Sequence, residues 1–408
     1  MPSITRRRLL GGGIAVASAT LGGALYRGAT DAAFASWTPA PGTWPHRRYD
    51  PANTAHNPHA TPPRETPTVR EVTSVSTAAK RPSFRPVVGP DHVALSGTGF
   101  AAYPRNGGDP VHDGDASTPL AAFGPDGRLH AVRRDPDGVD APSAVVDYAA
   151  DGLGEVARLP LGADHPQSLT VGSNDVYVAT VDAGIHALSP GGGRRWRADG
   201  TIAALGDGRL YAAGALDGTV AYGRRTGVDR RLRVGPERVW HTGSDPAHGF
   251  PHRPAVADGR LVIGTYAEGG GAVAAVDAGS GDLLWDPRPL GRDVATPALA
   301  GERGYTAVDV GERDAGLVVA LDLATGETRW RDDVAWTAVA PAVGGDVLVV
   351  AGEREGTGEA TRGVVRAYDV AAGDVLWTHV VGTGVPGGLA LVADRVLVTV
   401  GATLYELA

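Results

Sequence analysis

The 408-residue sequence contains no cysteine, a single lysine (Lys80) and few aromatic residues. Without a thiol, the chain can form no disulfide, no thiolate nucleophile, no zinc–thiolate site and no lipid-modified cysteine. The net charge of −8 disfavours binding to nucleic acid, because that function requires a basic surface. Phosphate-binding loops, the G-x-S-x-G and H-E-x-x-H motifs and the dinucleotide fingerprint are also missing. We therefore assign no catalytic residues, and a non-catalytic protein is favoured over an enzyme, with that question left open.

The first 35 residues resemble an export signal. A twin arginine within Arg6–Arg8 precedes a modestly apolar run from Gly11 to Tyr26, and Ala33–Ala35 offers a small-x-small cleavage site before Ser36. A short membrane anchor that is never cleaved is the alternative, although the run is at the short end for a membrane span. We expect an exported, extracellular or cell-surface protein, with membrane contact only through an uncleaved N-terminal segment.

Residues 36–65 are rich in Pro, Ala and Thr and show no periodicity. This composition predicts an extended linker that lies along the domain rather than an element of it. Residues 66–408 follow as one domain.

Three stretches of that domain repeat one pattern at spacings of 45 and 47 residues. Each has an apolar pair, an Asp, a Gly four residues later and a Trp four residues after that. Asp and Gly favour a tight turn between two strands, because Asp hydrogen-bonds to its own backbone and Gly accepts a positive φ. The stretches are AVDAGSGDLLW (275–285), ALDLATGETRW (320–330) and AYDVAAGDVLW (367–377).

A pattern of strand, turn and second strand marks the start of eight repeat units in this domain. These units begin near residues 85, 118, 168, 201, 253, 296, 340 and 388. Units of this length with four short strands predict an all-β fold, a single β-propeller of four-stranded blades. Eight blades are favoured, and seven remain possible because the first two units are poorly formed. The last unit lacks a fourth strand, so we expect residues 68–75 to supply it and close the ring. In the second and fourth units Leu159 and Leu232 stand where others have Trp.

The two faces of the expected propeller differ in the length of their loops. The turns between first and second and between third and fourth strands are short, as at 207–209, 258–260 and 324–326. The long segments fall on the other face, here called the long-loop face, which is where binding to a rigid scaffold usually occurs. These segments are Arg133–Ala144, Gly235–Arg253, Ala267–Gly271, Gly311–Gly316 and Gly352–Gly363.

Two clusters are weak metal candidates. His241, His248 and His252 lie in one connection near Asp245, but their spacing matches no known metal motif, and a solvated loop is favoured. The other cluster alternates carboxylates around a glycine, as calcium loops do, but lacks their distal bidentate Glu, so an ordinary turn is favoured. It comprises Asp135, Asp137 and Asp140.

The segments 254–285, 297–330 and 341–377 resemble the pyrroloquinoline-quinone (PQQ)-type propeller repeat. The string WPHRRYDPANT (44–54) is similar to the opening of many exported propellers of this type, W-P-x-x-x-x-D-x-x-N-T. The resemblance implies that the repeated Trp side chains dock neighbouring blades, a structural role carried to Trp196, Trp285, Trp330 and Trp377.

Some members of this family are quinoprotein dehydrogenases that bind PQQ and calcium at the propeller centre. Those proteins are much longer, and many carry a vicinal disulfide that this chain cannot form. Others bind no quinone and act as extracytoplasmic scaffolds, as in the outer-membrane assembly propeller, and this chain is more similar to them. We expect a non-catalytic, extracytoplasmic module without a cofactor that binds a protein, peptide or glycan on the long-loop face. The alternatives are a PQQ-dependent oxidoreductase with calcium and a purely structural part of the cell envelope.

Overall fold

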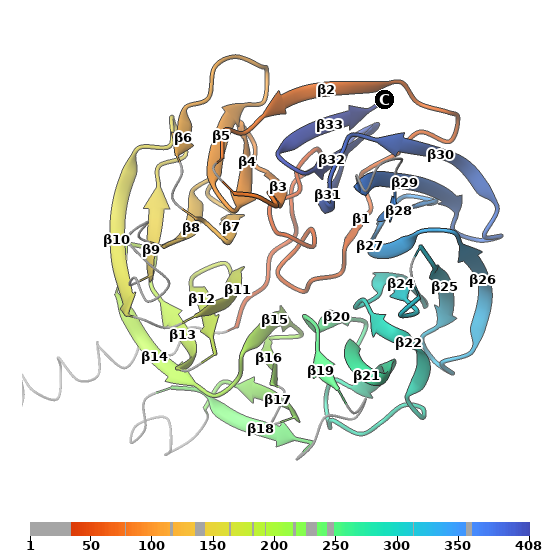
Figure 1. The fold of residues 1–408 in the computed structure, drawn as a ribbon. Coiled ribbons are helices and arrows are strands. Elements are labelled where there is room, and N and C mark those ends of the chain that lie inside the picture. Colours follow the sequence, from red (N-terminus) through yellow and green to blue (C-terminus); the bar gives the residue numbers. More distant parts are fainter. Residues whose placement is uncertain are drawn as a thin grey trace, which may run out of the picture.

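The structure is a computed structural model that describes residues 34–77, 79–114, 117–134, 143–162, 165–181, 183–191, 193–214, 218–225, 235–242, 249–312, 314–355 and 361–408. All regular elements among these residues are β-strands, and their sheets stand radially around a common centre (Figure 1). The predicted all-β propeller is therefore confirmed. In this described part of the chain no helix is long and apolar enough to cross a membrane.

The strands form units in chain order, each an antiparallel sheet with its first strand nearest the centre (Figure 1). Unit 1 contains β3 (Phe84–Val88), β4 (His92–Gly97), β5 (Phe100–Pro104) and β6 (His112–Gly114). Unit 2 contains β7 (Leu120–Phe123), β8 (Leu129–Arg134), β9 (Ser143–Tyr148) and β10 (Glu155–Gly162). Unit 3 contains β11 (Pro166–Val171), β12 (Val176–Thr180), β13 (Gly184–Leu188) and β14 (Arg194–Ala198). Unit 4 contains β15 (Ile202–Gly206), β16 (Arg209–Gly214), β17 (Gly218–Gly223) and β18 (Glu237–His241).

Units 5 and 6 share one eight-stranded sheet. Unit 5 contains β20 (Ala255–Ala257), β21 (Arg260–Asp277) and β22 (Arg288–Val294), and β19 (Phe250–Pro251) pairs with β21. Unit 6 contains β23 (Ala298–Ala300), β24 (Arg303–Asp309), β25 (Gly316–Asp322) and β26 (Thr328–Val334). Strand β21 folds back on itself, since the Ala272 amide donates to the Thr265 hydroxyl at 3.0 Å. Its two arms supply the second and third strands of unit 5.

Unit 7 contains β27 (Thr337–Gly344), β28 (Val347–Glu355), β29 (Thr361–Asp369) and β30 (Val375–Val381), with β1 (His56–Asn57) parallel to β27. Unit 8 contains β31 (Pro386–Val392), β32 (Arg395–Val400) and β33 (Thr403–Leu407). Its outer strand is β2 (Val69–Ser74), which pairs with β33, as the sequence predicted for residues 68–75. Strand β3 packs against β31, so the first and last units are neighbours. Six single-unit sheets and one double sheet favour eight blades over seven.

The repeated Asp–Gly turns explain how one unit docks on the next. Asp322 Oδ1 accepts the amides of residues 324 and 325, and Gly326 has a positive φ of 69°. The ring of Trp285 from unit 5 lies directly on Gly326, and its indole N–H donates to the Leu323 carbonyl at 3.1 Å. Trp330 repeats this arrangement on Gly373 of unit 7. Because glycine is the one residue without a side chain, it permits this close approach.

The other two repeated tryptophans have different partners. Trp377 donates to the Pro63 carbonyl at 2.7 Å, because unit 8 has no third-to-fourth turn of its own. Trp196 is buried and packs edge-on against Phe34 with ring centroids 5.8 Å apart, and it also contacts Tyr177. The fourth unit also has a docking tryptophan, which the sequence analysis missed. Trp240 on β18 packs on Gly281 and donates to the Ala278 carbonyl at 3.1 Å.

That finding corrects two expectations for unit 4. Leu232 is not the outer-strand residue of this unit, because β18 begins at Glu237, and Leu232 itself lies outside the described residues. In unit 2, by contrast, Leu159 lies on the outer strand β10 as expected. The segment 235–253 is not a single connection, because its residues 237–241 form β18. The long stretch of sequence between the end of β17 and the start of β18 obscured the repeat spacing.

Residues 44–57 cross the centre of the ring (Figure 1). This segment, called the plug below, hydrogen-bonds to the inner strand of every unit, so it belongs to the propeller core instead of lying along the domain as a linker. From unit 1 to unit 8 the partners are Trp44 and Val88, Pro45 and Phe123, His46 and Val171, Pro51 and Leu205, Ala52 and Val256, Thr54 and Leu299, Ala55 and Val343, and Asn57 and Leu391.

The D-x-x-N-T letters of the plug have identifiable structural roles. The Asp50 carboxylate accepts the Thr54 amide at 2.9 Å and the Thr54 hydroxyl at 2.7 Å, which folds this stretch into a compact turn. Asn53 has a φ of 59°, which asparagine tolerates better than most residues. Its amide nitrogen donates to the carbonyls of Ala203 at 3.2 Å and Pro254 at 3.0 Å. One side chain thus joins units 4 and 5.

The plug lies toward the short-turn face. Its partners stand at or beside the ends of the inner strands, where the tight turns to the second strands begin, such as Val88 at the end of β3 and Val171 at the end of β11. The centre is therefore filled on that side.

The packed core also extends to the N-terminal side of the plug. Phe34 is buried in unit 3, and the Ala35 carbonyl accepts the Ser173 amide at 2.8 Å. The expected cleavage position before Ser36 thus falls within a packed segment.

Candidate binding cavity

A cavity of about 550 Å³ lies at the centre of the ring, on the long-loop side of the plug. Trp44, Arg47, Arg48 and Ala55 of the plug form its floor. Its walls come from the first residues of inner strands, where they enter from the long-loop face. These include Gln167, Ile202, Thr296, Thr337 and Leu389.

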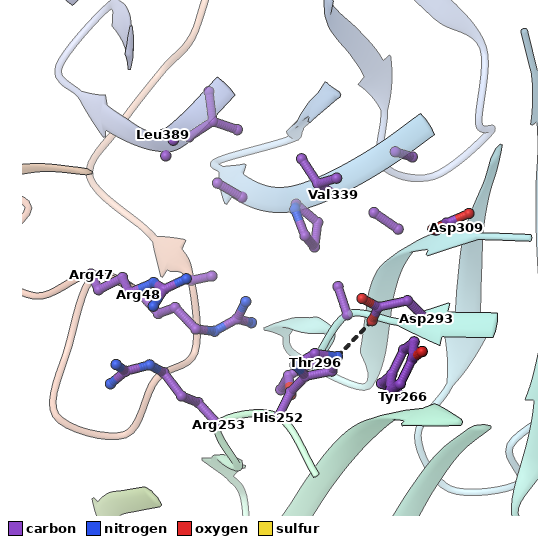
Figure 2. Close-up of a pocket in the computed structure, with 18 of the residues that line it drawn as sticks. Arg47, Arg48, His252, Arg253, Tyr266, Asp293, Thr296, Asp309, Val339 and Leu389 are labelled. Atoms are coloured by element: carbon purple, nitrogen blue, oxygen red, sulfur yellow. Dashed lines mark hydrogen bonds and ion pairs between the residues drawn. The ribbon is translucent and has the colours of Figure 1, made fainter. Parts of the chain in front are cut away.

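Arginines gather on one side of this cavity, as Figure 2 shows for Arg47, Arg48 and Arg253. Arg253 is buried and donates to the Gln167 carbonyl at 2.6 Å, while Arg48 donates to the Pro297 carbonyl at 2.7 Å. Arg47 keeps accessible surface, but that surface faces the cavity.

The environment of these arginines is unfavourable for positive charge. Burial, followed by the nearby Arg85 and Arg48, lowers the pKa of Arg253 to about 9. Burial lowers the pKa of Arg48 to about 10, against a partial offset from Asp50. The pKa of Arg47 falls well below its usual range because of burial and then the proximity of Arg85, Arg253 and Arg48. The floor therefore brings several guanidinium groups close together.

The opposite wall is acidic (Figure 2). Asp293 Oδ1 lies 2.6 Å from His252 Nε2, and Asp309 forms an ion pair with Arg292. Glu353 also lines the cavity, and burial, reinforced by Asp309 and Asp314, raises its pKa. Opposite charges thus occupy opposite sides of one cavity.

Two aromatic rings stand at the entrance to this wall. Phe250 on β19 pairs with Tyr266 at the end of the first arm of β21, with ring centroids 6.4 Å apart. The Phe250 side chain is 63% exposed and contributes to the cavity lining.

Of the metal candidates, the structure describes only His241 and His252. Asp135, Asp137, Asp140, Asp245 and His248 lie outside the described residues. His241 lies on the outer strand β18, whereas His252 lines the central cavity. Within the described ranges, no three His, Cys, Asp or Glu side chains form a group that could hold a metal ion.

The described residues do not provide the calcium site of the quinoprotein dehydrogenases. Calcium requires several oxygen ligands converging on one point, and the described residues provide no such group. The plug also fills part of the propeller centre, and the sequence has no cysteine for a disulfide beside a quinone.

The cavity arginines went unrecognised as site residues in the sequence. Arg47 and Arg48 belong to the WPHRRYDPANT string, and Arg253 lies two residues before the inner strand β20. A signal was present, because a charged residue at the start of an otherwise apolar inner strand must face the centre of a propeller. Interpreting it required knowing that the plug crosses that centre.

Comparisons with known proteins agree with this architecture. The family model described as outer membrane protein assembly factor BamB matches residues 233–358. A search of the curated proteins finds no match. Among solved structures, the computationally designed Ika8 protein is 14% identical, with 83% of this chain and 99% of that chain covered and a TM-score of 0.60.

Two natural propellers are also similar. Sqt1 of Saccharomyces cerevisiae is 11% identical, with 84% of this chain and 99% of its own covered and a TM-score of 0.59. The WD40 domain of SCAP from fission yeast is 10% identical, with coverage of 84% and 94% and a TM-score of 0.51. At such low identities these similarities show the fold alone. The resemblance to PQQ-type repeats is shown by the family match over residues 233–358. The chain is a β-propeller protein, and its residues 233–358 match the PQQ-type repeat.

Proposed function

We propose that the protein is an extracytoplasmic, non-catalytic binding module that holds a segment of a partner protein at the central cavity, entered from the long-loop face. The observation that carries this proposal is the asymmetry of the centre. The plug fills the short-turn side, and a cavity lined by charged groups lies on the other. A concave site with a few converging polar groups is the usual form of a ligand site.

The entrance has the chemistry of a protein-binding surface. The exposed ring of Phe250, beside Tyr266, supplies rigid apolar area at the edge of a charged cavity. Aromatic side chains of this kind are enriched at binding hot spots because they bury a large area at a small entropic cost. The scaffold beneath them is rigid, since the plug joins all eight inner strands.

The test is capture of partners from an envelope extract of the source cells by the immobilised protein. Phe250→Asp should abolish recovery, whereas Val156→Asp, on the outer strand β10 and 55% exposed, should leave it unchanged. Recovery by Phe250→Asp equal to that of the unmodified protein would contradict the proposal. Release of the captured material by a glycosidase instead of a protease would assign the site to a glycan.

A second measurement addresses the non-catalytic part of the proposal. Addition of PQQ and calcium to the purified protein should produce no reduction of a dye with alcohols or sugars. Dye reduction that depends on both additions would establish the oxidoreductase alternative.

A further inference from the structure

Four arginines from three distant parts of the chain converge beneath the cavity. Arg47 and Arg48 come from the plug, Arg85 from β3 and Arg253 from the residue pair before β20. The charge of Arg85 acts on both Arg47 and Arg253 and helps to lower the pKa of each after burial. Such grouping of like charges is unfavourable for buried Arg253 and half-buried Arg48 and Arg85, because bringing an unpaired charge out of water costs several kcal/mol. Arg47 keeps surface that is open to the cavity.

The protein itself supplies little compensation. No ion pair connects any of the four to a carboxylate of the described residues, although Asp50 lies close enough to Arg48 to act at a distance. A guanidinium has five N–H donors. Arg48 uses two of them, on the Asn53 and Pro297 carbonyls, and Arg253 uses one, on the Gln167 carbonyl.

The remaining two side chains have no acceptor at all among the described residues. Arg47 donates no hydrogen bond to any of them, and its surface opens into the cavity. The Nε atom of Arg85 is fully buried and lacks a hydrogen-bond partner. Buried donors without acceptors are rare in native proteins, and each calls for an explanation such as a bound ion.

We propose that the floor of the cavity binds an oxyanion, a carboxylate or a phosphate group, carried by the ligand that enters from the long-loop face. This inference rests on the proposed function for the path of entry. Guanidinium groups bind both oxyanions through paired N–H···O bonds, which are stronger than bonds between neutral groups.

The acidic wall determines on which side of the cavity an anion can bind. Asp293 and Asp309 already have partners in His252 and Arg292, while the Oε2 atom of Glu353 is buried without one. An oxyanion is repelled from that side and attracted to the arginines. Burial lowers the pKa of both Arg48 and Arg253, and for Arg253 the nearby Arg85 and Arg48 add to the shift.

The test measures binding of inorganic phosphate and of citrate to the full chain by calorimetry, with the thermal midpoint as a second readout. The informative variant is Arg47→Gln, because no hydrogen bond of the described structure is lost with it. The matched control is Arg194→Gln, an exposed arginine on the outer strand β14.

The unmodified protein and Arg194→Gln should bind one phosphate or citrate per chain and melt at a higher temperature with it. Arg47→Gln should bind at least about tenfold more weakly, as expected for loss of a charged hydrogen-bond donor. Without any anion it should melt at a higher temperature than the unmodified protein, because one of four like charges is gone. A purely structural arginine would do the opposite.

Stronger binding of phosphate assigns the site to a phosphate ester, and stronger binding of citrate assigns it to a carboxylate. Equal binding by Arg47→Gln and the unmodified protein would overturn the inference. If Arg47→Gln loses anion binding while Phe250→Asp still captures partners, the oxyanion site stands and the proposed entrance fails. If anions do not bind but Phe250→Asp abolishes capture, the proposed function stands and the oxyanion site fails.

Discussion

The ring of Trp285 lies so close to Gly326 that a Cβ atom at position 326 would stand 2.6 Å from the ring carbon Cδ2. These two residues belong to successive units, and the glycine has a φ of 69°. The contact therefore places two separate demands on one position, a left-handed backbone and the absence of a side chain.

Gly326→Ala should lower the free energy of unfolding by about 2–5 kcal/mol, the sum of left-handed backbone strain and overpacking. Gly259→Ala is a matched control, because Gly259 has a φ of 71° and an open space where its Cβ would lie. It should cost about 1–2 kcal/mol from strain alone. Urea unfolding of both variants separates the two contributions, and equal losses would show that the indole does not restrict position 326.

Trp240 should be as important as the tryptophans of the regular repeats. Trp240→Ala and Trp285→Ala should each destabilise the protein by about 3–5 kcal/mol, because each leaves a cavity between two units. Trp240→Phe should cost less, and about 1 kcal/mol of that loss comes from the hydrogen bond to Ala278. Thermal unfolding measures all three. An ordinary substitution lowers the free energy of unfolding by about 1 kcal/mol. A loss no larger than this for Trp240→Ala would contradict the docking role of Trp240.

Asn53→Asp should destabilise the protein strongly, because it replaces a donor to two carbonyls with a carboxylate that faces them. We expect a loss of about 2–4 kcal/mol, since two bonds are removed and a charge is left beside acceptors. Asn106→Asp, at an exposed position, should have little effect. Chemical denaturation compares the two. A small effect at position 53 would mean that the plug is not fixed by this side chain.

His46 should make stability depend on pH. Its Nε2 accepts the Val171 amide at 3.1 Å, and burial, followed by the nearby His130, lowers its pKa to about 3. In the unfolded chain a histidine binds a proton below pH 6.5, whereas folded His46 stays neutral. Its contribution is therefore complete above pH 6.5 and is lost as the pH falls toward 3, at about 1.4 kcal/mol per pH unit.

His46→Gln retains an acceptor but cannot be protonated, so it isolates this effect. Between pH 7.5 and pH 5 the unmodified protein should lose about 2 kcal/mol more than the variant. Buried Asp50, with a pKa raised to about 6, acts in the opposite direction in both proteins and cancels from the difference. Urea titrations at the two pH values provide the comparison. Parallel losses would show that His46 is accessible to protons in the folded state.

Much of the fold was predictable, because its signals are local. The Asp–Gly–Trp repeat specified a turn and a following strand, and the structure shows those turns with Asp322 and its counterparts accepting two backbone amides. Residues 68–75 were expected to complete the last unit, since that unit ends without a fourth strand, and β2 does pair with β33.

The cavity was not predictable for a physical reason. Its floor forms only when the plug crosses the ring, and that path depends on hydrogen bonds such as Asn57 to Leu391, which no periodicity in the sequence records. A Pro-rich stretch without alternation gives the same pattern whether it lies outside a domain or inside it. The sequence shows that Arg47 and Arg253 are present, but it does not show that they lie close together in the fold.

The plug also constrains the order in which this protein can fold. Asn57 and its acceptor Leu391 are 334 positions apart, and similar bonds reach every unit between them. Folding rates fall as contacts become more distant along the chain. The segment translated early completes its bonding only after the last unit has been synthesised. We therefore expect slow, late acquisition of the native state, with the eight units cooperating as one body.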